Sequence, residues 1–505
     1  MEASTAIVET KKFPAPGSKN PSPVQHAHSG LSCWNEVSQQ FQAIIMHAGR
    51  STHLQPATDG YPLAMLPIGN RPLLSYQLDY LERNGIAKIT VVIEKRFLAK
   101  VEKYMNSYFK PSRDGTEIEV VALSDEEESG NVLKLLKDRI TKDFIVLSGD
   151  VLVDVPLDQI IDHHNLNENS VTVLLKELDL SSKSKMPQKG EPESYDLFGL
   201  ADWTASPQSE NHTHRIVFKS NSVESQNMPL FVKASLLKKC HKMRVRSDLA
   251  DGGVYVFRYW VLRLFEELEK DYDVDNSSID DLITFMARNQ FKKKLAKYIV
   301  KPKSEPKLGL SSHSYQAKIQ AIMNPSLQTT KDLVKVAAFI DTEPLHYFVK
   351  FHNLKYYMLA NQDAMRLSTQ RPLFSYKGPS ADLYSQYKSQ IDENKREKRS
   401  VYEGLPAFLK QVSIDSSVQR DVEMGEKSQI SKSSVGRGVK VGARSKIVNS
   451  IIMNHVTIGS DVTIQNCLIL SKSQIGQKSK LKDAKVPFGQ VIEEKSNITG
   501  DGGQD

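Results

Sequence analysis

Residues 434–467 read SVGRGVKVGARSKIVNSIIMNHVTIGSDVTIQNC, which is two successive copies of a seventeen-residue pattern. Aliphatic residues recur in three columns, separated by steps of six, six and five residues within each copy. The columns run through five copies and hold Val418, Val435, Ile452, Ile469 and Val486; Met424, Val441, Ile458, Ile475 and Ile492; and Ile430, Ile447, Ile464, Leu481 and Ile498. One copy earlier, Ala407 and Ser413 break the pattern, so the repeat has a defined start.

An aliphatic residue at nearly every sixth position predicts a triangular coil with one short strand on each side. Stacked coils bury a continuous aliphatic column that no single coil could bury alone. Glycine follows the second column in four copies, at Gly425, Gly442, Gly459 and Gly476. A corner at this place requires a residue without Cβ. Residues suited to left-handed turns recur two places after the third column, at Asn449, Asn466 and Asp483. The sequence therefore predicts a parallel β-helix of five coils over residues 417–499.

His455 is the one histidine inside this repeat. Hexapeptide coils of some enzymes form acyltransferase sites with a catalytic histidine, so that role is one interpretation. No partner acid for His455 is identifiable in the sequence, and we favour a turn or surface histidine. An uncapped coil exposes strand edges, which indicates assembly through its flank or open end.

Residues 41–301 alternate between strand and helix patterns. Apolar or β-branched runs predict strands at 41–46, 88–94, 117–123 and 143–147, and further ones at 195–203, 230–237 and 253–257. Helical spacing of apolar residues predicts helices at 72–85, 97–109 and about 260–269. This alternation is typical of an α/β domain with a mostly parallel sheet covered by helices.

The expected division of the chain follows from these patterns. Residues 1–40 are polar and rich in Pro and Ser, and we expect a disordered extension. The sheet domain is expected over 41–301, a partly ordered bridging linker over 302–416, the β-helix over 417–499 and a flexible tail over 500–505.

Bulk composition limits the classes of protein to consider. No apolar run is long enough to span a bilayer, and residues 1–40 lack the apolar stretch of a signal peptide. Cys33, Cys240 and Cys467 lie far apart, which favours neither a disulfide framework nor a cysteine-based zinc site. We expect a cytoplasmic protein of the cytosol, with no membrane contact. The net charge of +7 is interpreted as a solvated basic surface; an acidic or nucleic-acid partner is the alternative, but no direct DNA binding is expected.

The first predicted strand opens a motif. Residues 43–58 read AIIMHAGRSTHLQPAT, and residues 61–72 read YPLAMLPIGNRP. This resembles the motif of sugar-nucleotide pyrophosphorylases, in which a Gly-rich loop precedes Thr-Arg-Leu and then Pro-Lys-Pro-Leu-Leu-Pro. The resemblance implies that backbone N–H groups of the loop hold nucleotide phosphates while Arg and Lys stabilise the departing pyrophosphate. Transfer builds negative charge on phosphate oxygens, so fixed cations are what the reaction requires.

The chain departs from the family at these positions. The family's Arg falls on His53 and its Lys on Leu63, and neither residue supplies a fixed cation near pH 7. Two loop glycines fall on Ala48 and Ser51, which restricts the approach of backbone to phosphate. The resemblance therefore implies no catalytic residue and no cofactor. The candidate site is a vestigial nucleotide pocket formed by Gly49, Ser51, Thr52, His53 and Asp150.

Asp150 follows the apolar run that ends in Leu147-Ser148-Gly149. The resemblance implies a magnesium-binding Asp at this place, and two interpretations are open: a retained metal ligand or a turn residue. We favour the turn residue and predict no metal site.

The order of a pyrophosphorylase-like domain, a bridge and a hexapeptide coil is similar to the gamma and epsilon subunits of eukaryotic translation initiation factor 2B. Residues 66–73 (LPIGNRPL), 196–199 (DLFG), 215–218 (RIVF) and Tyr356-Tyr357-Met358 with Ala360-Asn361 look like gamma. The epsilon subunit would add a helical exchange domain, whereas this chain ends at Asp505, shortly after its last repeat position.

This resemblance implies a Rossmann-like nucleotidyltransferase domain followed by a left-handed parallel β-helix. It implies a non-catalytic subunit that, with an epsilon-type subunit and the other subunits of factor 2B, supports GDP/GTP exchange on translation initiation factor 2. Two alternatives stay open: a regulatory subunit of a sugar-nucleotide pyrophosphorylase, and an active sugar-1-phosphate nucleotidyltransferase.

Overall fold

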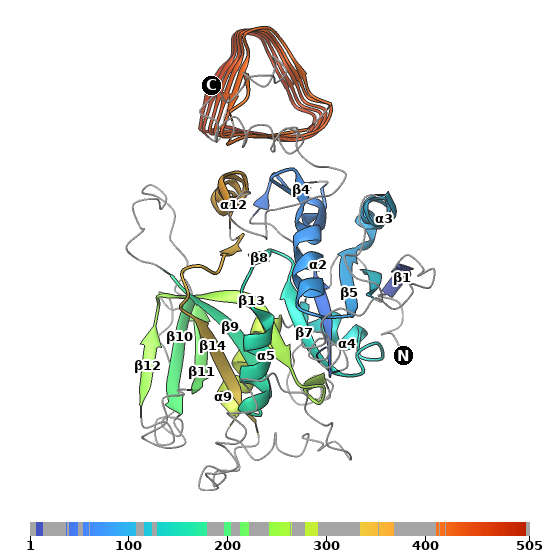
Figure 1. Ribbon diagram of the computed structural model, residues 1–505, viewed down its shortest axis with the longest axis vertical. Helices are drawn as coiled ribbons and strands as arrows, with labels where there is room; N and C mark the ends of the chain where they lie inside the picture. The colour runs from blue at the N-terminus through green and yellow to red at the C-terminus, as the bar shows by residue number, and fades with distance from the viewer. Residues whose placement is uncertain are drawn as a thin grey trace, which may run out of the picture. The chain divides into compact units, whose positions relative to one another are not determined.

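The computed structural model describes residues 7–13, 37, 40–48, 54–59, 61–107, 116–123, 129–178, 196–203, 213–221, 242–262, 264, 278–290, 334–351, 353–367, 411–413, 415–419 and 421–500. They belong to two compact units (Figure 1). The first unit takes in Met1–Arg50, Gln77–Leu98 and Lys110–Lys350, and the second takes in Ser51–Tyr76, Ala99–Phe109 and Phe351–Asp505. No helix among these described residues is long and apolar enough to cross a membrane.

The first unit is built on an eleven-stranded sheet of order β1-β6-β5-β2-β7-β13-β9-β14-β11-β10-β12. Its strands that share one direction include β2 (Phe41–Met46), β5 (Lys88–Glu94), β6 (Glu117–Leu123), β7 (Asp143–Ser148), β9 (Val171–Glu177) and β14 (Val336–Asp341). The strand β10 (Asp196–Trp203) also runs in this direction, and the opposite direction is taken by β1 (Ile7–Phe13), β11 (Thr213–Asn221), β12 (Met243–Arg246) and β13 (Leu249–Phe257). The strand β13 runs antiparallel between β7 and β9. The predicted mostly parallel α/β sheet is confirmed.

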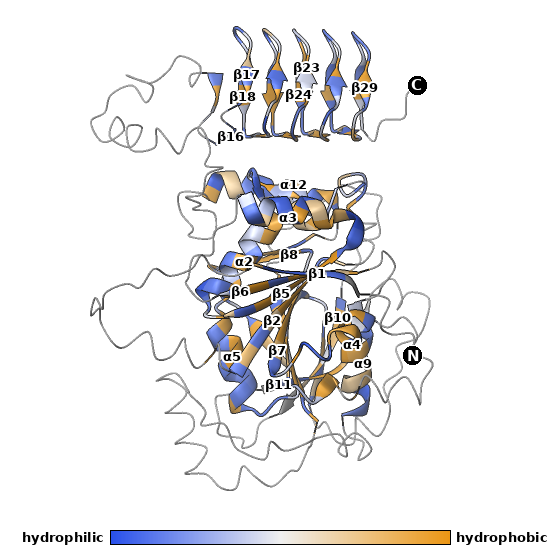
Figure 2. Cartoon of the chain, turned by 90° about the vertical axis from the view of Figure 1, so that its right-hand side faces the viewer, coloured by the Kyte–Doolittle hydropathy of each residue, from blue (hydrophilic) through white to orange (hydrophobic). Residues whose placement is uncertain are grey.

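Helices lie on both sides of this sheet, as Figure 2 shows for α4, α9 and α5. The helices of the described residues are α2 (Leu73–Arg83), α3 (Leu98–Ser107), α4 (Ser129–Leu135), α5 (Leu157–Leu166), α9 (Ile279–Asn289) and α12 (Leu354–Leu367). Val132 of α4 and Met286 of α9 are buried in one cluster with strand residues such as Val146. The sequence did not reveal α9, which begins at a capping box formed by Ser278 and Asp281.

The structure differs from the expected division at both ends of the sheet domain. The strand β14 lies between β9 and β11, although its residues fall in the expected bridge. Its run is short, and its parallel partner β9 is distant in sequence, so local pattern gave no reason to include it. The strand β1 forms the edge of the sheet next to β6, although its polar composition resembles that of a disordered segment. The strand expected at 230–237 and most of the helix expected at 260–269 lie outside the described residues.

The coil of the second unit consists of three five-stranded parallel sheets. The first holds β16 (Ser417–Val418), β19 (Ser434–Val435), β22 (Ile451–Ile452), β25 (Leu468–Ile469) and β28 (Lys485–Val486). The second holds β17 (Glu423–Met424), β20 (Lys440–Val441), β23 (Thr457–Ile458), β26 (Gln474–Ile475) and β29 (Val491–Ile492). The third holds β18 (Gln429–Ser431), β21 (Lys446–Val448), β24 (Thr463–Gln465), β27 (Lys480–Lys482) and β30 (Asn497–Thr499). The predicted left-handed parallel β-helix is confirmed by this topology, and Figure 1 shows its triangular outline.

The repeat columns fill the interior of the coil. Residues seventeen apart are register partners, as Ile447 is with Ile464, and all fifteen column positions lie in or against one hydrophobic cluster. A Cβ on Gly442 would come within 2.5 Å of the backbone carbonyl carbon of Gly459 in the next coil. Glycine is therefore required at this corner because successive coils pack too closely for a side chain. Asn449, Asn466 and Asp483 have φ of 51°, 53° and 56°, as their turn chemistry predicted. His455 is likewise a turn residue, with φ of 59°.

The second unit also brings together two segments on which the resemblance rests. A short hairpin of β3 (Pro67–Ile68) and β4 (Arg71–Pro72) contacts α12. The Tyr357 hydroxyl donates to the Pro67 carbonyl at 2.6 Å, and the Gly69 N–H donates to Asn361 Oδ1 at 2.9 Å. The Asn70 amide donates to the Ser417 carbonyl at 2.9 Å. The hairpin is therefore bonded to both α12 and the first coil.

Candidate functional site

The candidate site lies where β2 and β7 end. These parallel neighbours place Met46 opposite Ser148, so the segments after both strands leave the same edge of the sheet. Ligands of open α/β sheets bind at this carboxyl edge. Of the predicted pocket residues, Gly49, Ser51, Thr52 and His53 lie outside the described residues. Asp150 is described and lies in the turn after β7.

The turn that carries Asp150 is closely fixed. Gln77 of α2 donates its side-chain amide to the carbonyls of Ser148 and Val151, at 3.0 Å each. A Cβ on Gly149 would lie 2.1 Å from the Met46 carbonyl oxygen, so only glycine fits between the two strand ends. The Ser148 hydroxyl donates to the Asp150 carboxylate at 2.5 Å and orients it.

His47 follows β2 directly and is buried. Neither ring nitrogen has a hydrogen-bond partner among the described residues. Burial lowers the pKa of His47 to about 4, against weaker opposing effects of Gln77 and Asp150. The ring is therefore neutral near pH 7 and supplies no positive charge to this edge.

Acidification is expected to destabilise the first unit through this histidine. The folded-state pKa of about 4 lies below the ordinary 6.5, so the unfolded chain binds the proton more readily. The free energy of unfolding is therefore unaffected by this histidine above pH 6.5 and falls as the pH is lowered toward about 4. The total loss is about 3 kcal/mol. His47→Gln should reduce the slope of unfolding free energy against pH in this window by about 1.4 kcal/mol per pH unit. Chemical denaturation at several pH values measures both slopes, and equal slopes would contradict the assignment.

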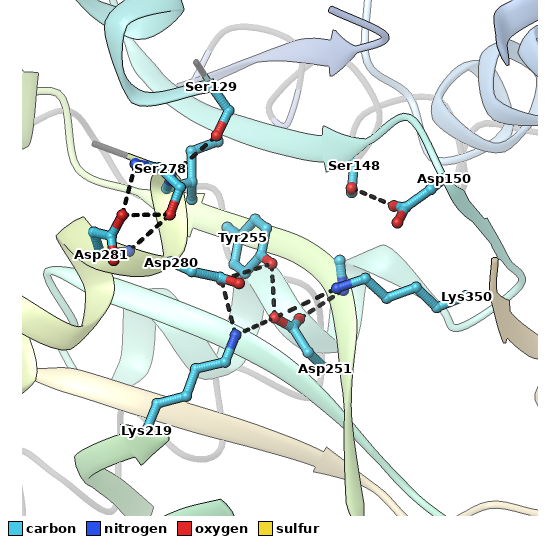
Figure 3. A network of polar contacts seen from close by, with 12 residues as sticks. Ser129, Ser148, Asp150, Lys219, Asp251, Tyr255, Ser278, Asp280, Asp281 and Lys350 are labelled. Carbon is cyan, nitrogen blue, oxygen red and sulfur yellow. Dashed lines mark hydrogen bonds and ion pairs between the residues drawn. The ribbon is translucent and has the colours of Figure 1, made fainter. Parts of the chain in front are cut away.

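A cluster of buried charges lies on the same side of the sheet domain as Asp150 (Figure 3). Lys219 of β11 binds the carboxylates of Asp251 at 2.7 Å and Asp280 at 2.8 Å. Asp251 of β13 also accepts hydrogen bonds from the Tyr255 hydroxyl at 2.8 Å and from the Gly253 N–H at 2.9 Å. Four elements therefore meet in this cluster, since Asp280 comes from α9 and Lys350 from β15 (Phe348–Lys350).

Lys350 connects the cluster to Asp150. The strand β15 pairs with β8 (Val151–Val153), which places Lys350 opposite Val151, the residue after Asp150. The Lys350 ammonium lies 3.8 Å from the Asp251 carboxylate. Burial would lower the pKa of Lys350, but Asp251 and then Asp150 raise it above its usual value. Lys350 is therefore charged near pH 7, and its ammonium lies against the Asp251 carboxylate.

The pKa values of the cluster follow from its pairing. Burial would raise the pKa of Asp251, but Lys219 and Lys350 lower it well below its usual range. Burial would lower the pKa of Lys219, and Asp251 with Asp280 raise it above its usual range. Burial and the Asp251 charge raise the pKa of Tyr255. Among the described residues of this cluster, the ammonium groups of Lys219 and Lys350 are engaged with the carboxylates of Asp251 and Asp280, so their charge is balanced within the protein.

Leu63, at the position of the family's Lys, lies half-buried in the short 3-10 helix Leu63–Met65 of the second unit. Ala48, at the place of a loop glycine, packs against the core of the first unit. Both positions are occupied by hydrocarbon side chains, so neither side chain offers a hydrogen-bond donor or a charge to a nucleotide.

Sequence reasoning missed the charged cluster. The available signal was a charge inside an apolar strand run, as with Lys219 after Ile216-Val217-Phe218 and Asp251 between Leu249 and Val254. Buried charges require partners. The partners come from α9 and β15, which lie far away in sequence, and only the topology brings them together.

Comparison with known proteins gives two family matches. Residues 42–185 match the nucleotidyl transferase family, and residues 410–505 match the GlmU-like C-terminal hexapeptide family. Both matches agree with the fold of their segments.

The chain is similar to translation initiation factor eIF2B subunit gamma of Dictyostelium discoideum, with 31% identity over 245 residues, 46% of this chain and 53% of that protein. The gamma subunit of Schizosaccharomyces pombe is 28% identical over 264 residues, 50% of this chain and 52% of that protein. The bifunctional protein GlmU of Methanococcus maripaludis strain C5 is 33% identical over 125 residues, 24% of this chain and 28% of that protein. The chain thus spans about half the length of the gamma subunits it matches, and the predicted resemblance to them is confirmed.

Proposed function

We propose that this chain is a gamma-type subunit of translation initiation factor 2B, which supports GDP/GTP exchange on translation initiation factor 2 and does not transfer nucleotides. The observation that carries the proposal is the similarity to two gamma subunits over about half of the chain. Its partners would be an epsilon-type subunit, the other subunits of factor 2B and factor 2 itself, in the cytosol. The sheet domain and the coil offer broad surfaces for such an assembly.

The loss of nucleotidyl transfer is supported by the charges at the site. Leu63 stands where the related enzymes have a lysine, and Lys219 and Lys350 are engaged with carboxylates. Transfer needs preorganised cations directed at phosphate oxygens. A subunit of this kind can act by holding its partner protein near the catalytic domain of another subunit, which removes entropy from their encounter.

No nucleotidyl transfer is expected from GTP, ATP or UTP with glucose-1-phosphate, mannose-1-phosphate or N-acetylglucosamine-1-phosphate. A coupled pyrophosphate-release assay measures this, with an active GlmU as the positive control. Turnover that disappears on Asp150→Ala would contradict the prediction, because the pocket would then still be catalytic.

The exchange role is tested by release of labelled GDP from factor 2. The chain alone should release GDP at the spontaneous rate, and adding it to the epsilon-type partner should exceed the rate of the partner alone. Fast release by the chain alone would overturn the scaffold role. No gain over the partner alone would overturn the assignment as a subunit.

The similarity to GlmU over 125 residues favours a second candidate, a regulatory subunit of a sugar-nucleotide pyrophosphorylase. The two candidates differ in the proteins they bind. A pyrophosphorylase whose rate changes on addition of this chain would favour the second.

A further inference from the structure

The turn after β7 is where the resemblance implies a magnesium ion at Asp150, and the surrounding donors test that implication. Magnesium requires about six oxygen ligands at roughly 2.0–2.1 Å in octahedral geometry. No group of three or more His, Cys, Asp or Glu side chains is arranged to hold a metal ion within the described part of the chain. The carboxylates to compare with such a set are Asp150, after β7, and Asp251 and Asp280 of the charged cluster.

Proton donors already engage these oxygens. Asp251 Oδ1 accepts from the Gly253 N–H, and Asp251 Oδ2 accepts from Lys219 and from the Tyr255 hydroxyl. Asp280 Oδ1 accepts from the same Lys219 ammonium. A metal ion at Asp251 would have to displace an ammonium and a hydroxyl that are both largely buried. The donor set therefore does not fit a divalent cation.

Lys350 adds a second cation beside the Asp251 carboxylate. Its strand pairs with β8 opposite Val151, and its side chain is only 14% exposed. Figure 3 shows the Lys350 ammonium reaching toward Asp251 from the side on which Asp150 lies. A divalent ion bound to Asp150 on this side would meet a fixed positive charge at short range in a partly desolvated site.

We propose that the Lys350 ammonium takes the place of a divalent cation between Asp150 and Asp251, so that an internal lysine neutralises these carboxylates and excludes metal. Asp150 would then keep its place and its hydrogen bond from Ser148 at the end of β7 without serving as a metal ligand.

Manganese binding to the full chain tests the proposal, by electron paramagnetic resonance of free Mn²⁺ and by thermal unfolding with and without the ion. The wild-type chain should bind no more Mn²⁺ than Asp150→Asn, and its unfolding temperature should not change. Lys350→Met should gain affinity by at least about tenfold, since one positive charge is removed from the site. Adding Asp150→Asn to Lys350→Met should abolish that gain. Lys350→Arg, which keeps the charge, is the matched control and should remain without Mn²⁺.

Mn²⁺ binding by the wild-type chain that is lost in Asp150→Asn would overturn the proposal. A folded Lys350→Met variant without any gain would overturn it as well, because the ammonium would not be what excludes the metal. If Lys350→Met does not fold, Lys350→Gln is measured in the same way. Failure of both neutral variants, with Lys350→Arg folded and without Mn²⁺, would support an obligatory internal cation.

Discussion

Ile458→Asp is expected to unfold the β-helix or to lower its free energy of unfolding by roughly 4 kcal/mol or more. Ile458 occupies the second column in the middle coil, between Val441 and Ile475, and its side chain is 2% exposed. A carboxylate at this position would be buried among aliphatic side chains without a partner. The coils above and below share the same column, so the defect affects more than one coil.

The neighbouring Thr457 provides the matched control. Thr457 belongs to the same strand, β23, and is exposed because successive side chains of a strand point to opposite faces. Thr457→Asp should change the free energy of unfolding by no more than about 0.5 kcal/mol. Lys446→Asp, at another exposed position, should be similarly mild. Urea denaturation followed by circular dichroism compares the variants, and equal midpoints for Ile458→Asp and Thr457→Asp would contradict the column assignment.

Asp251→Asn should destabilise the first unit by roughly 3–5 kcal/mol. The substitution preserves the shape of the side chain but removes the fully buried charge that binds Lys219 at 2.7 Å. Lys219 is 10% exposed and would keep only Asp280, so most of its desolvation cost would no longer be offset. Lys350 would lose a partner as well.

Asp280→Asn is the comparison, because the Asp280 side chain is 48% exposed and solvent screens its interaction. We expect an effect of about 1 kcal/mol or less for it. The double variant Asp251→Leu with Lys219→Met should recover the part of the loss that comes from an unpaired Lys219, while Lys350 still lacks its Asp251 partner. Equilibrium unfolding of the wild type, Asp251→Leu, Lys219→Met and the double variant gives the coupling energy of the pair. An Asp251→Asn cost no larger than that of Asp280→Asn would show that the cluster does not stabilise the fold.

The β-helix was predictable because each coil repeats the same residue pattern and packs against a neighbouring coil with that pattern. Each column residue has the same neighbours one coil away, so spacing alone identifies the interior. Asn449, Asn466 and Asp483 then identify a corner, since few residues other than glycine adopt left-handed geometry. Strands β2, β5 and β6 were also predicted with their observed bounds, because each is a continuous apolar or β-branched run.

The charged cluster was not predictable in the same way. Lys219, Asp251, Asp280 and Lys350 come from four elements, and no local spacing relates them. The strand β14 illustrates the same limit, because its place between β9 and β11 depends on a long-range crossover. Of the predicted pocket residues, Asp150 follows an apolar run, and the strand predicted from that run leads to the carboxyl edge of the sheet, where Asp150 lies. Its surroundings, including Lys350, depend on pairing between β8 and β15.

The most direct test of the proposed subunit role is affinity purification of the tagged full chain from its own cells, with the bound proteins quantified by mass spectrometry. The account predicts an epsilon-type subunit in nearly equal amount, together with the alpha, beta and delta subunits of factor 2B. It also predicts that factor 2 is enriched over a purification from untagged cells. Recovery of a catalytically active sugar-nucleotide pyrophosphorylase as the main partner, with no subunit of factor 2B, would contradict it.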